Sequence, residues 1–120
     1  MNALSIFDYL YRDAGNYKSW RSVLLEGCAT SADIEAVKAS LDRGEFFIAE
    51  QLGIPAAYAK PQEGKNTPTE EDHVWHEFSG LRPAQADERV GEPWGTIAEL
   101  VMRFRSVTRW DERLSPHWDL

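Results

Sequence analysis

Two segments near the start of the chain alternate apolar and polar side chains with the period of a β-strand. In residues 6–12, aromatic rings occupy every second position, at 7, 9 and 11. Residues 17–25 resume an extended pattern after Asp13-Ala14-Gly15-Asn16, in which glycine and asparagine tolerate the positive φ of a tight turn. The two segments predict a β-hairpin.

Two helices are predicted from apolar residues at helical spacing behind capping residues. The first follows Thr30, carries Asp33 in its first turn and stops at Gly44; its apolar residues are Ile34, Val37 and Leu41. The second begins with a capping box of Thr96 and Glu99. Its apolar stripe consists of Ile97, Leu100, Val101, Phe104 and Val107.

Two further segments are predicted to be strands. Residues 46–52 are aromatic and β-branched, and residues 73–81 alternate in side-chain character. Thr67-Pro68-Thr69-Glu70 matches a helix capping box, so a helix is the alternative for residues 73–81. Residues 60–72 are rich in turn-forming residues and predict a surface loop.

These elements predict one α+β domain spanning residues 1–120, in the order β-β-α-β-β-α. We expect an antiparallel sheet of about four strands, with both helices covering one face. The 120-residue length suits a single hydrophobic core. Because no apolar run reaches the ~18 residues of a membrane span, no membrane contact is expected. A lone cysteine, Cys28, cannot form an internal disulfide, so a cytoplasmic location is expected.

Charge and aromatic content narrow the classes of partner. The net charge of −7 is concentrated in residues 26–95, so a wide basic face for duplex nucleic acid is not expected. A small anion suits the two end segments, residues 1–25 and 96–120, where the field is least negative. Five tryptophans are more than one small core comfortably hides, which favours a homo-oligomer.

Asp72-His73-Val74-Trp75-His76-Glu77 contains the residue types that bind metals. On a strand, however, His73 and His76 point to opposite faces, and no spacing elsewhere indicates a third ligand. Histidines hydrogen-bonded within or beside the core are the preferred interpretation. Cys28 precedes a helix cap, where the helix dipole could lower the pKa of its thiol. No sequence feature places a histidine beside it, so a structural cysteine is the preferred interpretation. No phosphate-binding glycine loop is present, and no cofactor is expected.

Cations and rings gather around the predicted turn. Arg12, Lys18 and Trp20 are not needed to form a turn, and cations beside rings suit a planar anionic ligand. The alternative is an ordinary hairpin in which Arg12 pairs with Asp13. Arg105 and Arg109 lie four residues apart on the second helix without an acidic neighbour on that flank. Their mutual repulsion favours a bound anion or an acidic subunit surface in front of them, with a solvated flank as the alternative.

Three patches of sequence lie within residues 9–80: Tyr11-Arg12-Asp13-Ala14-Gly15-Asn16-Tyr17-Lys18, Phe46-Phe47-Ile48-Ala49-Glu50-Gln51-Leu52-Gly53-Ile54-Pro55 and Asp72-His73-Val74-Trp75-His76-Glu77-Phe78. Together they resemble small phage proteins that counter the Thoeris defence system by sequestering its cyclic nucleotide signal. The resemblance implies a non-enzymatic, oligomeric sponge with aromatic and arginine side chains around the ligand. It implies that Trp20 and Phe78 stack on bases and that Arg105 or Arg109 meets phosphate.

The sequence therefore predicts a non-enzymatic protein that captures a small nucleotide-like anion and releases it intact. The expected ligand-binding residues are Arg12, Lys18, Trp20, Phe78, Arg105 and Arg109. One alternative is a protein–protein interaction module, such as an inhibitor or immunity protein that uses its acidic surface. Another is a metal-dependent hydrolase that uses Asp72, His73, His76 and Glu77.

Overall fold

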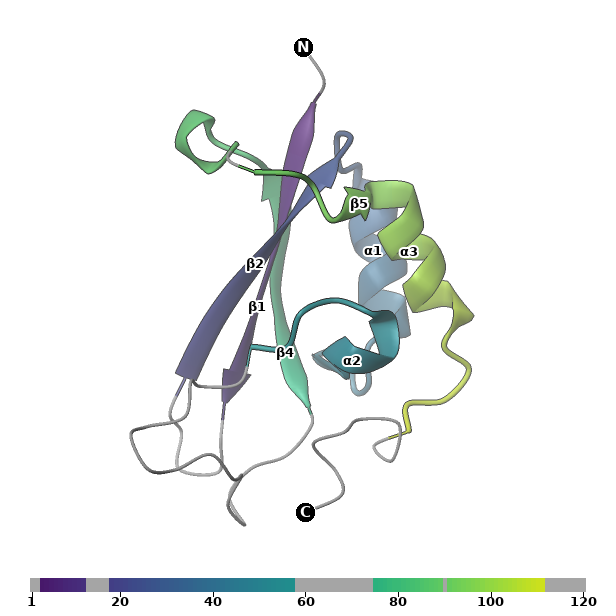
Figure 1. Cartoon of the computed structure of the whole chain (residues 1–120). Coiled ribbons are helices and arrows are strands. Elements are labelled where there is room, and N and C mark those ends of the chain that lie inside the picture. The colour runs from purple at the N-terminus through teal and green to yellow at the C-terminus, as the bar shows by residue number, and fades with distance from the viewer. Residues whose placement is uncertain (1–2, 13–17, 58–74, 90, 112–120) are drawn as a thin grey trace, which may run out of the picture.

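A curled sheet with helices packed on one face makes up the protein (Figure 1). The computed structural model describes residues 3–12, 18–57, 75–89 and 91–111. Its strands are β1 (Leu4–Arg12), β2 (Lys18–Glu26), β3 (Phe46–Phe47), β4 (His76–Pro83) and β5 (Gly95–Thr96). Its helices are α1 (Ser31–Ser40), α2 (Ala49–Leu52) and α3 (Ile97–Ser106), with a 3₁₀ turn, η1, at Ala86–Glu88.

The α+β class is confirmed, but the sheet differs from the one expected. Five strands lie in the order β3-β4-β1-β2-β5. Three neighbouring pairs are antiparallel, whereas β2 and β5 pair in parallel through Leu25 with Gly95 and Glu26 with Thr96. The expected four-stranded antiparallel sheet is therefore wrong. The parallel pair is short because β5 leads directly into α3.

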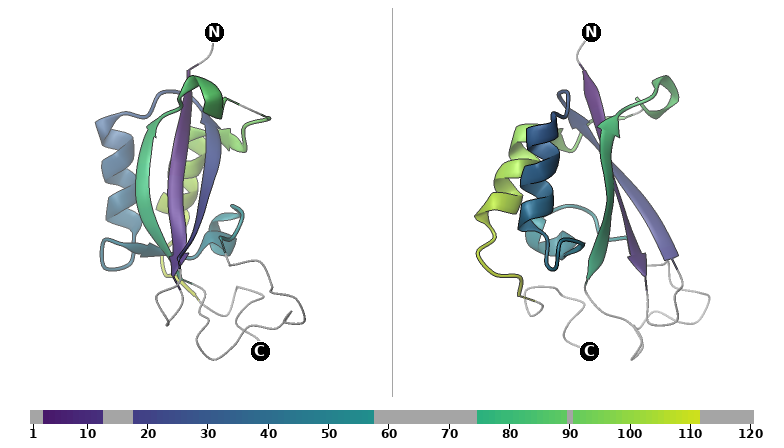
Figure 2. Two further views of the ribbon diagram at one scale, coloured as in Figure 1. Left: turned by 90° about the vertical axis from the view of Figure 1, so that its left-hand side faces the viewer. Right: turned by 180° about the vertical axis from the view of Figure 1, so that it is seen from behind.

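The two long helices begin where their caps predicted. The Thr30 side chain accepts a hydrogen bond from the Asp33 N–H, and the Thr96 side chain accepts one from the Glu99 N–H. Figure 2 shows α1 and α3 on the same side of the sheet, as expected. In α1 the helix ends earlier than Gly44, because Leu41 already has extended backbone angles. No helix among the described residues is long and apolar enough to cross a membrane.

The predicted strand over residues 46–52 is only partly present. Phe46 and Phe47 pair with β4 at the edge of the sheet, and the chain then turns into α2. This turn buries Ala49 and Leu52 and ends at Gly53, whose φ of 76° is left-handed. The result is a third helix that the pattern did not indicate. The predicted strand over residues 73–81 is confirmed from His76 onward as β4, while residues 73 and 74 and the loop 60–72 lie outside the described residues.

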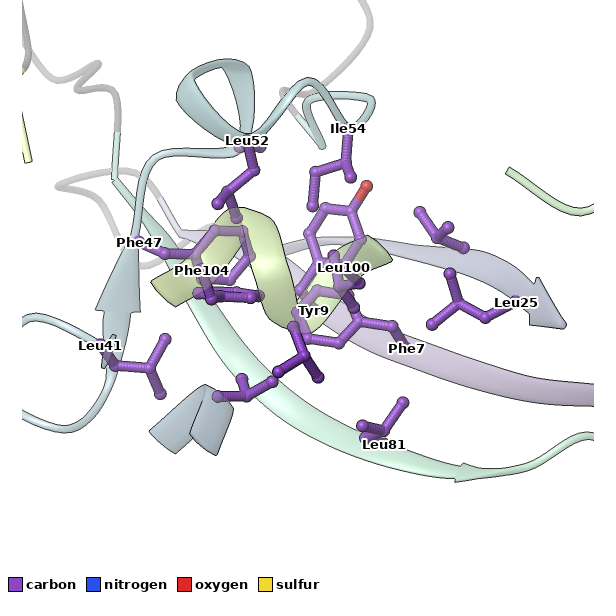
Figure 3. Packing of buried hydrophobic residues seen from close by; sticks show 14 of the residues in the cluster. Phe7, Tyr9, Leu25, Leu41, Phe47, Leu52, Ile54, Leu81, Leu100 and Phe104 are labelled. Atoms are coloured by element: carbon purple, nitrogen blue, oxygen red, sulfur yellow. The ribbon is translucent and has the colours of Figure 1, made fainter. Parts of the chain in front are cut away.

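Aromatic rings from strands and helices fill the core (Figure 3). The Phe7 ring lies 5.7 Å from that of Phe47 and 5.9 Å from that of Phe104. Tyr9 is fully buried beside them, and its hydroxyl donates to the Pro55 carbonyl. Burial raises the pKa of Tyr9 to about 12, so the phenol stays protonated and keeps this hydrogen bond.

A β-bulge divides β4 into two halves. Asp8 pairs with Gly80 and Tyr9 pairs with Phe78, which leaves Ser79 as the extra residue. Because side chains alternate along a strand, the extra residue changes which positions face the helices. Phe78 faces the core before the bulge, and Leu81 faces it afterwards.

A clamp formed by Arg103 and Trp94 joins α2 to α3. Arg103 Nη1 donates to the Leu52 carbonyl at 2.9 Å, and Trp94 Nε1 donates to the Gly53 carbonyl at 3.1 Å. The Arg103 guanidinium also lies 5.0 Å from the centroid of the Trp94 ring. These contacts satisfy carbonyls at the end of α2 that lack intrahelical partners.

The clamp predicts different costs for two glycine substitutions. Gly44 and Gly53 have similar positive φ angles, 71° and 76°, so alanine at either position costs about 1–2 kcal/mol of backbone strain. A Cβ at Gly53 would also lie 2.4 Å from Arg103 Nη1, whereas one at Gly44 would meet nothing within 4 Å. The flexible Arg103 guanidinium can move aside, but it then loses its hydrogen bond to the Leu52 carbonyl. Gly53→Ala should therefore lower the free energy of unfolding in urea by about 0.5–1.5 kcal/mol more than Gly44→Ala.

An Arg103→Ala background supplies the control. Without the guanidinium, the two glycine substitutions should cost the same free energy of unfolding, because only the shared backbone strain remains. An unchanged difference between Gly53→Ala and Gly44→Ala in that background would contradict the role of Arg103.

Candidate functional site

The sheet has an outer face, which we define as the face of β1, β2 and β4 that points away from α1 and α3. Figure 2 (left) looks onto it, with the two long helices behind the sheet. Even-numbered residues of β1 point outward, and so do the residues directly opposite them on β2. The outer-face side chains used below are Asp8, Leu10, Arg12, Lys18, Trp20, Ser22, Glu77 and Arg82.

Three of the six predicted ligand-binding residues meet on this face. Arg12 lies directly across from Lys18, and the next outward pair is Leu10 with Trp20. The Trp20 side chain is 61% exposed, although its neighbour Leu10 is buried. An exposed indole thus lies beside two cations, Arg12 at the last residue of β1 and Lys18 at the first residue of β2.

Arg12 is held in place by an acidic partner that the sequence did not indicate. Its Nε donates to Glu77 Oε2 at 2.9 Å, and its Nη2 donates to Glu77 Oε1 at 3.4 Å. The expected alternative partner, Asp13, lies outside the described residues. Glu77 is opposite Leu10 on the neighbouring strand, so only the β1–β4 register brings it to Arg12. The ion pair orients Arg12 and offsets part of its charge.

A second charged cluster lies farther along the outer face. Arg82 Nε donates to Asp8 Oδ2 at 2.8 Å, while its two terminal nitrogens donate to the Glu88 carboxylate, each at 2.7 Å. Ser22 Oγ donates to the other oxygen of Asp8 at 2.6 Å. The hydrogen bond to Glu88 raises the pKa of Arg82, and the same bond lowers the pKa of Glu88 to about 2. All these charges are therefore paired within the face.

Phe78 lies on the opposite face of the sheet from Trp20. Its ring is 5.6 Å from the Phe7 ring, and its side chain packs against the buried core. The resemblance implied that Trp20 and Phe78 both stack on bases, but the fold separates them by the thickness of the sheet. The bulge at Ser79 contributes, because without it Phe78 and Leu81 would not face the same side.

Arg105 and Arg109 lie in two separate depressions in the helix layer. Arg105, exposed on α3, lines a shallow depression that also includes Asp33 of α1. Arg109 follows α3 and lines a cleft of ≈ 440 Å³ together with Gln51, Arg103, Ser106, Val107, Thr108 and Asp111. Arg109 Nη2 lies 3.8 Å from Asp111 Oδ2, so an acidic neighbour is present where none was expected. Mutual repulsion of the two arginines is therefore not evidence for a bound anion.

The predicted metal-binding segment is described only in part. Asp72 and His73 lie outside the described residues. His76 is fully buried, and its Nε2 accepts a hydrogen bond from the Ala57 N–H at 2.9 Å. Both carboxylate oxygens of Glu77 contact Arg12. Within the described ranges, no group of three histidine, cysteine, aspartate or glutamate side chains is placed to hold a metal ion.

Cys28 is exposed in a depression where β2 ends and α3 begins. The depression measures ≈ 650 Å³ and is also lined by Asp33 and Thr96. Asp33 Oδ2 accepts from the Thr30 N–H and hydroxyl, each at 2.9 Å, so this carboxylate serves the cap of α1. No histidine lines this depression among the described residues.

The outer face therefore brings together Arg12, Lys18 and Trp20 and leaves Phe78, Arg105 and Arg109 elsewhere. Sequence reasoning missed Arg82 and Glu88 and named Glu77 only as a candidate metal ligand. The β1–β4 register sets the pairing of Glu77 with Arg12 and of Arg82 with Asp8, whereas Glu88 reaches Arg82 from the 3₁₀ turn. Comparison with protein-family models, curated proteins and solved structures gave no match.

The Arg82 cluster predicts a contribution to stability that disappears in acid. The pKa of Glu88 is lowered from 4.5 to about 2 in the folded protein, so folding favours its ionised form. This contribution is fully present above about pH 4.5 and is lost as the pH falls toward 2. We expect wild type to lose more of its urea stability between about pH 6 and about pH 3 than Glu88→Gln.

A matched control is Glu92→Gln, because Glu92 is exposed and forms no ion pair among the described residues. It should follow the wild-type pH dependence. A Glu88 carboxyl that titrates near 4.5 in the folded protein, measured by NMR, would contradict the assignment.

Proposed function

We propose that the protein binds a small, planar, nucleotide-like anion on the outer face and releases it unchanged. The observation that carries the proposal is the exposure of Trp20, 61%, beside Arg12 and Lys18 on one strand face. A large exposed indole next to cations suits a base joined to a phosphate. The proposal concerns binding without catalysis.

Trp20 would supply the stacking surface. Its cross-strand neighbour on the same face is Leu10, which is only 5% exposed. Stacking on a base contributes roughly 1–3 kcal/mol per base and tolerates different bases. Trp20 alone therefore favours a class of planar ligand and does not select one base.

Lys18 and Arg12 would interact in different ways with the negative charge of the ligand. Lys18 is exposed, and no ion pair of Lys18 occurs among the described residues. Arg12 already shares its guanidinium with Glu77, so an anion must compete with this carboxylate. Lys18 would therefore provide most of the charge attraction, while Arg12 would add a directed hydrogen bond.

The class of ligand is suggested by the resemblance of three sequence patches to proteins that sequester a cyclic nucleotide signal. A cyclic nucleotide joins planar bases to phosphate, which matches the ring and cations on the outer face. The proposed role is capture of such a signal, and the resemblance is the only support for that role.

Calorimetry against cyclic mononucleotides, cyclic dinucleotides and ADP-ribose cyclisation products tests the proposal. Trp20→Ala should weaken binding by about tenfold to a hundredfold. Lys18→Ala should weaken it by a few-fold, and more strongly at low salt, where charge attraction is least screened. Glu77→Gln should tighten binding, because it removes a carboxylate that competes with the ligand for Arg12.

Matched controls come from the opposite layer of the protein. Met102→Ala removes a second large exposed apolar side chain of the described residues, which is 59% exposed on α3. Arg105→Ala removes one positive charge, as Lys18→Ala does, but on the far side of the sheet. Both controls should leave affinity unchanged. The proposal fails if no compound binds below about 100 μM or if the bound compound is recovered cleaved.

A further inference from the structure

Among the residues that the structure describes, one edge of the sheet is unpaired along most of β2. On one side β2 pairs with β1 along its whole length, from Lys18 to Glu26. On the other side only Leu25 and Glu26 pair with a strand, the short β5. The segment Lys18–Val23 therefore has no strand on that side within the described part of the chain.

The hydrogen-bond pattern shows which backbone groups face this edge. The Gly27 N–H donates to the Ala3 carbonyl at 2.8 Å, which continues the β1–β2 ladder and directs odd-numbered residues of β2 toward β1. In agreement, the Leu24 carbonyl faces away from β1, because it accepts from the Trp94 N–H at 2.9 Å. The N–H and C=O groups of the preceding even-numbered residues, Lys18, Trp20 and Ser22, therefore face the open edge.

These outward groups find no hydrogen-bond partner among the residues that the structure describes. The side chains of Lys18, Trp20 and Ser22 are also exposed. An extended edge with unpaired backbone groups is a template for another strand, and proteins usually cover such an edge or protect it with charge.

We propose that this edge pairs with the same edge of a second copy, antiparallel and about a two-fold axis at Trp20. In this register Trp20 lies opposite Trp20 of the second copy, and Lys18 lies opposite its Ser22. All outward backbone groups of Lys18, Trp20 and Ser22 then find partners, and the sheet continues from one copy into the other.

Other symmetric registers fit less well. Centring the axis on Arg21 would set two arginines directly opposite each other, and like charges in that position are destabilising. Centring it on Ser22 would require outward groups of Leu24 and Glu26, which already serve Trp94 and β5. In the Trp20 register, Arg21 lies opposite Ser19, so no like charges are paired.

The pairing also accounts for the exposed indole. Trp20 would contact its equivalent across the axis, and Lys18 of the second copy would lie diagonally beside the ring, where a cation is attracted to its face. The inference rests on backbone geometry and does not depend on the proposed ligand.

A pair of cysteines tests the register while keeping Trp20. In a Cys28→Ser background, Lys18→Cys and Ser22→Cys together place thiols opposite each other, about 5.5 Å apart between Cα atoms, within disulfide range. Oxidation should give a covalent dimer on a non-reducing gel. Each single variant should remain monomeric on the gel, because its two cysteines lie about 13 Å apart along the strands. No cross-link in the double variant, or equal cross-linking in a single variant, overturns the register.

Sedimentation measures the association itself. Wild type should form dimers at micromolar concentration, and Trp20→Glu, which opposes two carboxylates, should raise the dimer dissociation constant at least tenfold. Met102→Glu adds the same charge at an exposed apolar residue of α3 and should leave association unchanged. A monomeric wild type at about 100 μM overturns the proposal. Because neither experiment contains a ligand, a failed ligand screen leaves these results intact.

Discussion

The pairing of β1 with neighbours on both sides is the constraint on which the rest of the structure depends. Its odd-numbered side chains, including Phe7 and Tyr9, form the wall against which the helices pack. Its even-numbered side chains, including Asp8 and Arg12, belong to the outer face. Because the side-chain period of a strand is two, a one-residue slip would exchange these two sets. Core and outer face are thus fixed by the same register.

The outer face, which α1 and α3 do not cover, combines clusters of paired charges with apolar side chains such as Leu10. Arg82 draws the carboxylates of Asp8 and Glu88 together, and Arg12 pairs with Glu77. Each of these groups is partly exposed, so solvent screening reduces what the pairs contribute to the free energy of unfolding. They do leave the charges matched within the face. Trp20 stands outside both clusters, which is why it is the feature of this face available to a ligand or to another chain.

Local patterns predicted the elements that are determined locally. The hairpin follows from alternation, and α1 and α3 follow from Thr30 and Thr96 with their apolar positions. Contacts distant in sequence decided the rest. The strand β3 contains only Phe46 and Phe47, because its partner β4 begins at His76, opposite Phe47. The chain then continues into α2.

The predicted ligand set was divided for the same reason. The sequence grouped Arg12 and Trp20 around the predicted turn, and the structure has them on one face, since both belong to a single antiparallel pair. Phe78 could not be assigned to a face, because the extra residue at Ser79 is visible only once β4 is aligned with β1.

The bulge at Ser79 also limits where the chain can gain or lose residues. Removing one residue there would turn half of β4 over and bring either Phe78 or Leu81 to the solvent side. Substitutions at Ser79 leave the strand's two halves in phase, whereas insertions and deletions would not, so natural length variation is expected in the connections and not in this strand.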